Sequence, residues 1–271
     1  MGYPDQRAEL QPHVSVLTLR LAGALSEVNS AALAIGGLRR NAGGRVILDG
    51  VDLQLDPGET VALVGANGAG KSTLIRTILD LRAAHGGTVT LAGRPNTDRH
   101  ARAAVAYLPE RFQPPTYLSG NEFLDYMLAL YGVTPAGRGA REAAAALGLG
   151  GDALARPVAT YSKGMGQLLG LTACIASGRP LLIFDEPMDG LDPAARVRLR
   201  QALNVRRAEG ASVLFSTHLL SDAAEFADRV AILHEGRIAA DGSVAEICER
   251  FGAEDLESAY LHCTGEAAAP A

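Results

Sequence analysis

The chain is poor in aromatic residues and in cysteine. It has no tryptophan, 6 phenylalanines and 7 tyrosines among 271 residues. The three cysteines, Cys174, Cys248 and Cys263, form no CxxC pair. This argues against a zinc site or a disulfide framework and favours a reducing cytoplasm.

Long apolar runs are also missing. The run from Val14 to Leu25 is interrupted by Arg20, so it falls short of the roughly 20 residues that a membrane-spanning helix needs. The first ten residues contain acids and Pro4, where a signal peptide has a basic cap and an apolar run. We therefore expect neither direct membrane insertion nor export, and we interpret residues 1–30 as an N-terminal leader.

Basic residues are slightly fewer than acidic ones. The chain has 25 Lys and Arg and 30 Asp and Glu, which gives a formal net charge of −5. This argues against broad attraction to nucleic acid or to an anionic bilayer, so we expect no nucleic-acid partner. Apolar residues at 48% and charged residues at 20% are ordinary for a folded soluble protein. Only the alanine-rich end, residues 266–271, is predicted to be disordered.

The order of the sequence patterns indicates an α/β fold. From Leu33 onward, LAIGGL and RVILDGVDLQL alternate apolar with polar or small residues, which predicts antiparallel strands with one wet face. Three short apolar runs, at 60–64, 181–184 and 212–215, are typical of strands buried on both faces of a parallel sheet.

Helical spacing occurs in two places. The first is Ser72 to Leu81, directly after a glycine-rich turn. The second lies between Asn121 and Leu149, with Gly132 and Gly148 as expected stops. We interpret this second region as a helical insertion.

Residues 65–72, GANGAGKS, match the pattern G-x-x-x-x-G-K-[ST] between a predicted strand and a predicted helix. Glycines let successive backbone N–H groups turn inward around a phosphate, and the helix directs its positive end to the same group. Lys71 would neutralise the β- and γ-phosphates, and the Ser72 hydroxyl would bind Mg²⁺. This loop alone leaves kinases, GTPases, helicases and transporters open. The predicted nucleotide-binding residues are Gly65, Asn67, Gly68, Ala69, Gly70, Lys71, Ser72 and Thr73.

Two adjacent acids, Asp185 and Glu186, directly follow the apolar run 181–184. The carboxyl ends of parallel strands share one edge of a sheet, so the acids are expected near the phosphate loop. Asp185 would orient Mg²⁺ or its waters, and Glu186 would polarise the water that attacks the γ-phosphate. The alternative interpretation is a solvated turn.

Three further motifs follow: YSKGMGQ at 161–167, DGLDP at 189–193 and STH at 216–218. With the phosphate loop and the LLIFDEP strand, they resemble the nucleotide-binding subunits of ABC transporters from about residue 33 to residue 265. The YSKGM segment and the tail LESAYLHCTG at 256–265 are similar to the exporter branch that serves drugs, polysaccharides and similar cargo.

The resemblance implies a P-loop NTPase (RecA-like) core with a mostly parallel sheet, an antiparallel β subdomain and a helical insertion subdomain. Residues 31–265 would be the ATPase domain, with the helical insertion at about 111–178. It also implies two ATP molecules with Mg²⁺ between two head-to-tail subunits, a homodimer in the first instance or a pair with a related chain. The pair would sit on the cytoplasmic face of the cell membrane, bound to a separate permease subunit.

The resemblance also assigns roles to residues that spacing alone leaves ordinary. Ser162 and Gly164 would act in trans on ATP held by the other subunit, and Asp192 would lie at the subunit interface. Taken alone, YSKGMGQ is a capped helix start and Asp192 a turn or cap before a proline.

Two more roles come from the same resemblance. His218 would contact the γ-phosphate and link it to the catalytic water and Glu186. Glu110 takes the place of a family glutamine that senses Mg²⁺ and touches the permease, and a carboxylate can also meet Mg²⁺. The predicted catalytic residues are Glu186, His218 and Lys71, and the predicted metal ligands are Ser72, Glu110 and Asp185.

The sequence departs from the family at the adenine end of the site. The family stacks adenine on an aromatic that aligns near Ala42, but no aromatic residue occurs between positions 4 and 106. Loss of this platform forfeits about 1–3 kcal/mol of stacking, so we expect weak base discrimination. Arg39, Arg40 or Arg45 could instead stack a guanidinium group on the base.

The permease contact is expected on the insertion and the loop before it, within residues 111–131. This range contains five of the aromatic residues, Phe112, Tyr117, Phe123, Tyr126 and Tyr131, although helix packing accounts for them equally well. A nucleotide-gated scaffold with little turnover and no permease is the alternative function. A soluble ABC ATPase acting on DNA or ribosomes is a third, disfavoured by the chain's length and acidity.

Overall fold

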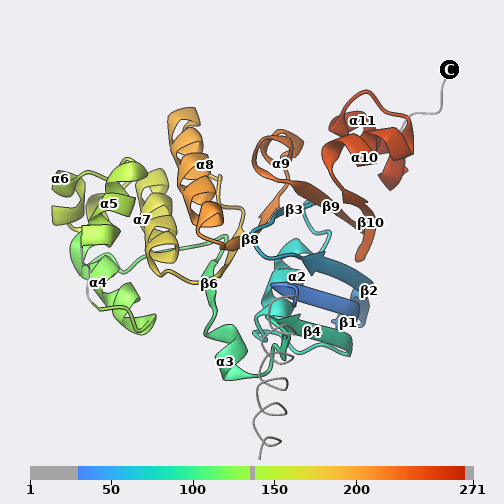
Figure 1. The fold of residues 1–271 in the computed structure, drawn as a ribbon, viewed down its shortest axis with the longest axis horizontal. Coiled ribbons are helices and arrows are strands. Elements are labelled where there is room, and N and C mark those ends of the chain that lie inside the picture. The colour runs from blue at the N-terminus through green and yellow to red at the C-terminus, as the bar shows by residue number, and fades with distance from the viewer. Residues whose placement is uncertain (1–29, 135–137, 266–271) are drawn as a thin grey trace, which may run out of the picture.

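The structure of the protein, a computed structural model, describes residues 30–134 and 138–265. Apart from Ser30, the predicted leader lies outside these ranges, as does the predicted tail at 266–271. The described chain contains two β-sheets with helices around them (Figure 1).

The smaller sheet is antiparallel and has the order β2-β1-β4-β5. The alternating strands predicted from Leu33 onward are confirmed as its β1–β2 pair, in which Leu33 lies opposite Leu55. Its strands are β1 (Leu33–Ala42), β2 (Arg45–Leu55), β4 (Gly86–Leu91) and β5 (Arg94–Pro95).

The larger sheet has the order β10-β9-β3-β8-β7-β6, in which the five strands from β9 to β6 are parallel and β10 is an antiparallel edge. Every residue of β3 and β7 is buried, as the continuous apolar runs predict. The strands are β3 (Thr60–Val64), β6 (Val105–Leu108), β7 (Leu181–Asp185), β8 (Ser212–Thr217), β9 (Arg229–His234) and β10 (Arg237–Gly242). The predicted α/β class with a mostly parallel sheet and an antiparallel β part is confirmed.

The helix after the phosphate loop, α2 (Lys71–Ile78), is shorter than the predicted Ser72 to Leu81. Its C-terminus closes because Asp80 takes a left-handed φ of 57° and the Leu81 N–H returns to the Arg76 carbonyl at 2.9 Å. Leu81 is therefore 61% exposed and does not continue the buried face.

The remaining helices form one group at each end of the molecule, with α3, α8 and α9 between these groups (Figure 1). The helices from α4 to α7 gather at one end, and α10 and α11 lie near the chain's C-terminus (Figure 1). The Ser119 hydroxyl caps the start of α4, and Gly132 and Gly148 follow α4 and α5 as expected. The helices are α3 (Arg99–Arg102), α4 (Gly120–Leu130), α5 (Arg138–Ala146), α6 (Gly151–Ala155), α7 (Lys163–Ala176), α8 (Pro193–Ala208), α9 (Leu220–Phe226), α10 (Val244–Phe251) and α11 (Leu256–Thr264), with a 3-10 turn at Val158–Thr160. No described helix has the length and apolarity needed to span a bilayer.

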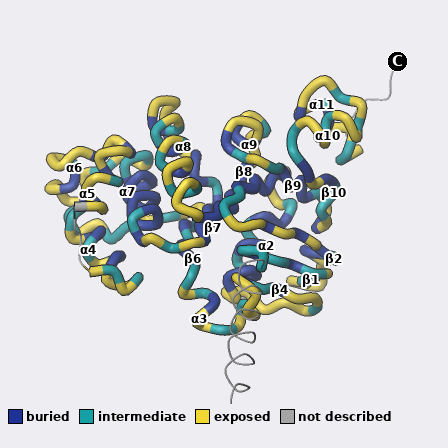
Figure 2. The backbone as a smooth tube through the Cα atoms, viewed as in Figure 1, coloured by how far each residue is buried: buried dark blue, intermediate teal, exposed yellow. Residues whose placement is uncertain are grey.

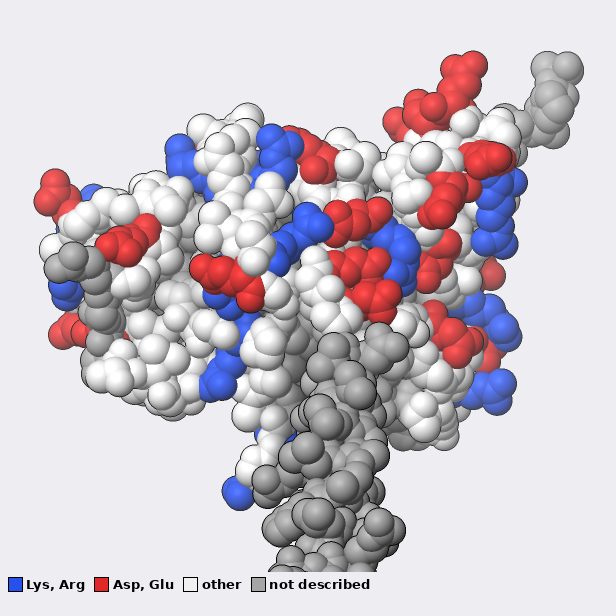
Figure 3. All heavy atoms as spheres, viewed as in Figure 1, with Lys and Arg blue, Asp and Glu red and all other residues white. Residues whose placement is uncertain are grey.

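The larger sheet separates two hydrophobic cores. Ala62 and Val64 of β3 face the core that includes α7 and α8, whereas Val61 and Leu63 face the core shared with α2 and the smaller sheet. Strand alternation thus buries both faces, and Figure 2 shows the buried residues concentrated along the middle of the molecule. On the face in Figure 3, acidic and basic side chains are mixed, without a broad patch of one sign.

The two sheets meet at a close backbone contact beside the phosphate loop. The Asp49 N–H of β2 donates to the Gly236 carbonyl in the β9–β10 turn at 2.9 Å. A Cβ added to Gly236 would lie 2.5 Å from the Ile47 carbonyl, and one added to Gly70 would lie 3.2 Å from the same oxygen. The Ile47 backbone therefore packs between the turn and the loop.

We expect Gly236→Ala to destabilise the protein by about 2–4 kcal/mol, because a backbone clash adds to the cost of a left-handed alanine. Gly44→Ala is the matched control, since Gly44 has the same φ of 76° with nothing within 4 Å of an added Cβ. The control should cost only about 1–2 kcal/mol. Urea unfolding of both variants measures the difference, and equal losses would contradict the role given to this contact.

Candidate functional site

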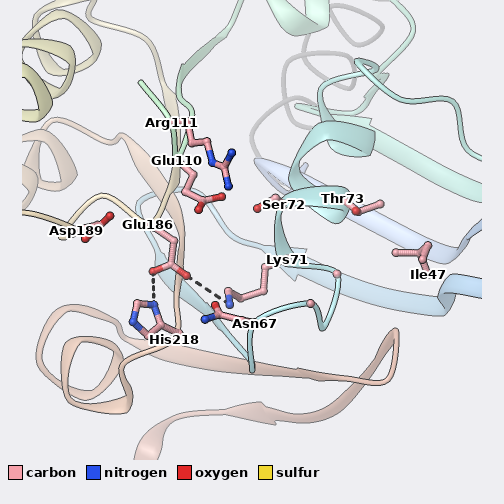
Figure 4. Close-up of a pocket in the computed structure, with 12 residues that line it drawn as sticks. Ile47, Asn67, Lys71, Ser72, Thr73, Glu110, Arg111, Glu186, Asp189 and His218 are labelled. Atoms are coloured by element: carbon pink, nitrogen blue, oxygen red, sulfur yellow. Dashed lines mark hydrogen bonds and ion pairs between the residues drawn. The ribbon is translucent and has the colours of Figure 1, made fainter. Parts of the chain in front are cut away.

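A cavity of about 580 Å³ opens at the phosphate loop. It lies at the carboxyl ends of β3 and β7, where parallel α/β sheets bind ligands. Figure 4 shows its charged side chains converging from several separate segments. The lining residues are Ile47, Asn67, Gly68, Gly70, Lys71, Ser72, Thr73, Glu110, Arg111, Glu186, Asp189 and His218.

The phosphate loop presents free backbone donors to this cavity. Gly70, the residue before α2, has a left-handed φ of 110° and provides no side-chain cap for the helix. The first N–H groups of α2 therefore keep their hydrogen-bonding capacity for a ligand. An uncapped helix N-terminus after a glycine-rich turn fits a phosphate group.

Lys71 is held inside the loop that it belongs to. Its side chain is 7% exposed, and its Nζ donates to the Gly65 carbonyl at 2.7 Å. The same Nζ lies 3.4 Å from Glu186 Oε1. A buried ammonium needs an anion, and in this structure Glu186 provides it.

Glu186 links Lys71 to His218 (Figure 4). It follows β7 with a φ of 52°, a left-handed conformation that costs a glutamate about 1–2 kcal/mol. Its N–H donates to Ser216 Oγ at 2.9 Å, and its Oε2 lies 2.9 Å from His218 Nδ1. This geometry directs a carboxylate, held by an imidazole, into the cavity.

Asp185 is fully buried and does not line the cavity. Its Oδ1 accepts from Ser216 Oγ at 2.6 Å, while Oδ2 has no hydrogen-bond partner among the described residues. A buried carboxylate oxygen without a partner fits Mg²⁺ or its bound water. Burial first, and the Asp185 charge second, raise the pKa of neighbouring Tyr107, which keeps that phenol neutral.

Carboxylates alone would not bind Mg²⁺ at this site. Within residues 30–134 and 138–265, no three His, Cys, Asp or Glu side chains form a group that could hold a metal ion. Mg²⁺ commonly keeps waters and phosphate oxygens alongside one or two carboxylates. The predicted set of Ser72, Glu110 and Asp185 is compatible with this kind of site, since Ser72 and Glu110 line the cavity and Asp185 lies buried next to Glu186.

The structure does not bring Ser162, Gly164 and Asp192 into this cavity. Ser162 caps α7 by accepting the Met165 N–H at 3.2 Å, and Asp192 caps α8 by accepting the Ala195 N–H at 2.7 Å. A Cβ on Gly164 would lie 2.7 Å from the Gly190 carbonyl, so the YSKGMGQ and DGLDP segments pack together. Lys163 and Asp189 join them further through an ion pair of 2.7 Å.

Arg196 ties the DGLDP segment to the helix after His218. Arg196 Nη1 lies 2.7 Å from Asp222 Oδ1, and its Nε donates to the Leu191 carbonyl at 3.4 Å. Burial raises the pKa of Asp222, and the Arg196 charge opposes that shift. The pair connects α8 to α9.

Three lining residues escaped the sequence-based assignment: Ile47, Arg111 and Asp189. The sequence could have identified Asp189 as a site residue, because Asp189 begins the DGLDP motif. It could also have identified Arg111, which directly follows Glu110. Ile47 lay in a predicted strand but gave no sign of facing a ligand.

The arginines proposed for the base end do not line the cavity. Arg39 lies 3.6 Å from Asp49, Arg40 donates to the Ala83 carbonyl, and Arg45 is exposed. Stacking of one of these arginines on a base stays a prediction. Ile47 lines the cavity with an apolar side chain.

Residues 48–189 match the ABC transporter family. This range contains the phosphate loop, Glu110, the YSKGMGQ segment and the two adjacent acids. More than half of the chain therefore matches the family.

Relatives extend the similarity along the chain. The chain is 37% identical to the uncharacterized ABC transporter ATP-binding protein all4389 of Nostoc sp. over 206 residues. This alignment covers 74% of the chain and 61% of the relative. The chain thus spans less than two thirds of that relative's length. It is 32% identical to the lantibiotic transport ATP-binding protein SrtF of Streptococcus pyogenes, across 84% of this chain and 95% of SrtF.

A solved structure described as the ATP binding subunit of an ABC transporter superposes with a TM-score of 0.79 at 33% identity. The superposition covers 86% of this chain and 99% of the solved structure. The family match, the relatives and this superposition agree with the geometry of the phosphate cavity, and the chain belongs to the ATP-binding proteins of the ABC transporter family.

Proposed function

We propose that this chain is the ATP-hydrolysing subunit of an exporter, which powers a separate membrane permease through ATP-driven closure of a dimer. The proposal rests on the contacts of Glu186 with Lys71 and with His218. These residues line a cavity that also contains an uncapped helix N-terminus. These groups suit a triphosphate, a base for water and a partner that orients the base.

In the proposed reaction, a water attacks the γ-phosphate of ATP in line with the leaving diphosphate. Glu186 accepts a hydrogen bond or a proton from that water, and His218 holds the Glu186 carboxylate in place. Lys71 exchanges its contact with Glu186 for the phosphate oxygens, and its charge stabilises the transferring group.

Ser72, Asp185 and Glu110 would hold Mg²⁺. When bound, Mg²⁺ supplies positive charge that offsets the charge of the phosphate oxygens. The unpartnered Oδ2 of Asp185 is the feature of this chain that favours such a role.

A second subunit would complete the site. Ser162 is exposed and lies outside its own chain's phosphate cavity, at the N-terminus of the 14-residue helix α7. A serine hydroxyl, the Gly164 backbone and that helix end suit a γ-phosphate approached from the far side. The partner would be a second copy of this chain or a related ATPase subunit, with Asp192 at their interface.

The permease would bind at a second cavity of about 790 Å³, which shares Glu110, Arg111 and Asp189 with the first. Of its two walls, the loop after β6 would contact the permease, and Tyr117 in that loop is 83% exposed. The start of α7 forms the other wall, where Ser162 would face the second subunit. Exposed aromatic residues are enriched where proteins dock. The chain would thereby sit on the cytoplasmic face of the membrane, and the described transport role of SrtF favours export.

The alternative is a nucleotide-gated scaffold with little turnover. The lack of any aromatic residue between positions 4 and 106 favours it, whereas the contacts that join Lys71, Glu186 and His218 favour hydrolysis. A turnover measurement on the purified chain separates the two.

Glu186→Gln should lower the ATP hydrolysis rate by about 10²–10⁴-fold, because the general base is lost. The variant should also bind ATP several-fold more tightly, since Lys71 loses its competing carboxylate, an effect of about 1 kcal/mol. Single-turnover kinetics and equilibrium binding measure the two effects. Lys71→Ala is the control and should lose both binding and hydrolysis. If the Glu186→Gln variant hydrolyses ATP at the parent rate, Glu186 is not the general base.

Base selectivity should be weak. Without aromatic stacking worth about 1–3 kcal/mol, kcat/KM for ATP, GTP, CTP and UTP should agree within about fivefold. Ile47→Tyr should raise kcat/KM for purine nucleotides by about fivefold or more, because the new ring can stack on the base. Ile47→Leu is the matched control, with no ring. A strong ATP preference in the parent chain would contradict this interpretation of Ile47.

Gentle detergent extraction of native membranes, with MgATP present, should recover this chain together with a polytopic membrane protein. Tyr117→Ser should reduce that recovery about tenfold, because an exposed aromatic anchor of the docking cavity is lost. Val205→Ser is the control, since Val205 is 59% exposed on α8 and lies outside both cavities. Recovery of the chain without any membrane protein would favour the scaffold alternative.

A further inference from the structure

The phosphate cavity contains an acidic side chain without a partner. Three carboxylates line it, those of Glu110, Glu186 and Asp189. Glu186 pairs with Lys71 and Asp189 pairs with Lys163, at 3.4 Å and 2.7 Å. Among the described residues, Glu110 makes no hydrogen bond or ion pair, although it faces the place where the proposed triphosphate would lie.

Arg111 is the other charged lining residue without a partner. Its side chain is exposed and makes no hydrogen bond or ion pair within the described part of the chain. It is also the only cation besides Lys71 among the residues that line this cavity in the described structure. An exposed arginine without a contact has no ion pair to break when it turns to a ligand.

The loop after β6 directs both side chains into the same space. In an extended strand, consecutive side chains point to opposite faces. Figure 4 instead shows Glu110 and Arg111 reaching from one segment toward Ser72. Pro109 precedes the pair and restricts the backbone there, so this is a property of the folded loop.

Their position identifies the end of the nucleotide that they would meet. Figure 4 places Ile47 on one side of Lys71 and Ser72, and places Glu110, Arg111 and Glu186 on the other. Because the base would lie toward Ile47, the terminal phosphate would lie toward Arg111 and the hydrolytic carboxylate. A carboxylate there repels phosphate, and an adjacent guanidinium offsets that repulsion.

We propose that Arg111 is a phosphate-binding residue that offsets the Glu110 charge and contacts the terminal phosphate of a bound nucleoside triphosphate. The inference rests on the proposed ATPase function. It makes Arg111 a selector of triphosphate over diphosphate, because a diphosphate has no group at that end of the cavity. The guanidinium fork suits phosphate oxygens better than an ammonium group does.

The test is equilibrium binding of ATP and of ADP, each with Mg²⁺, to the full chain carrying Glu186→Gln so that ATP persists. In that background, Arg111→Ala should weaken ATP binding about tenfold, the effect of losing one charge-assisted contact, and change ADP binding less than about twofold. Arg111→Lys should fall between the two. Arg99→Ala is the matched control, because it removes an exposed arginine outside the cavity and should change neither affinity.

Removing the Glu110 charge separates the two parts of the proposal. In a Glu110→Gln background, Arg111→Ala should cost about threefold rather than tenfold, because only the direct phosphate contact is left to lose. Thermal melting of each variant checks that the fold is intact.

Equal losses of ATP and ADP affinity, or losses no larger than those of Arg99→Ala, would overturn the assignment of Arg111. An effect seen only when a membrane permease is bound would also overturn it and would place Arg111 in the docking cavity. If the parent chain binds no nucleotide, and Lys71→Ala changes nothing, the proposed function itself is wrong. Binding that depends on Lys71 but not on Arg111 leaves that function standing and rejects only this inference.

Discussion

The buried ammonium of Lys71 is the constraint on which the site depends. A charge that is 7% exposed must have an anion and several hydrogen-bond acceptors, or it destabilises the fold. The phosphate loop supplies the Gly65 carbonyl, and β7 supplies Glu186. A phosphate can take the place of Glu186 without exposing the ammonium. Binding of a nucleotide and release of the hydrolytic carboxylate would then be the same event.

Strand geometry gives the two adjacent acids different surroundings. Asp185 completes β7 and stays buried, with one oxygen on the Ser216 hydroxyl and the other unpartnered. Glu186 turns into the left-handed region and enters the cavity, while its N–H binds the same Ser216 hydroxyl. One side chain from β8 thus positions both acids, and their different environments favour different roles, one toward a metal and one toward water.

Nucleotide and permease would act on a shared wall. Glu110, Arg111 and Asp189 line both the phosphate cavity and the second cavity assigned to docking. Asp189 is also bound to Lys163 beside the exposed Ser162, which would face the second subunit. A change in the charge at the terminal phosphate would therefore act on residues that border all three proposed contacts. The packing of Gly164 against Gly190 keeps these segments together as one unit.

Much of the fold and part of the site followed from local sequence. Buried strands such as Thr60–Val64 were evident, because a short apolar run between turns is typical of a strand covered on both faces in an α/β protein. The phosphate loop was evident as well, since its glycines, Lys71 and Ser72 work within eight consecutive residues. The end of α2 was predicted three residues too late, because the left-handed turn at Asp80 carries no glycine to mark it.

The sequence by itself therefore determined the strands β1, β2, β3, β7 and β8, the phosphate loop and the pair Asp185 and Glu186, because each depends on neighbours along the chain. Only the tertiary structure decided that Ile47 and Arg111 enter the cavity and that Ser162 stays out of it. These placements depend on how β2, the loop after β6 and α7 converge around the sheet edge. Such convergence is set by packing between distant segments, which no local pattern records.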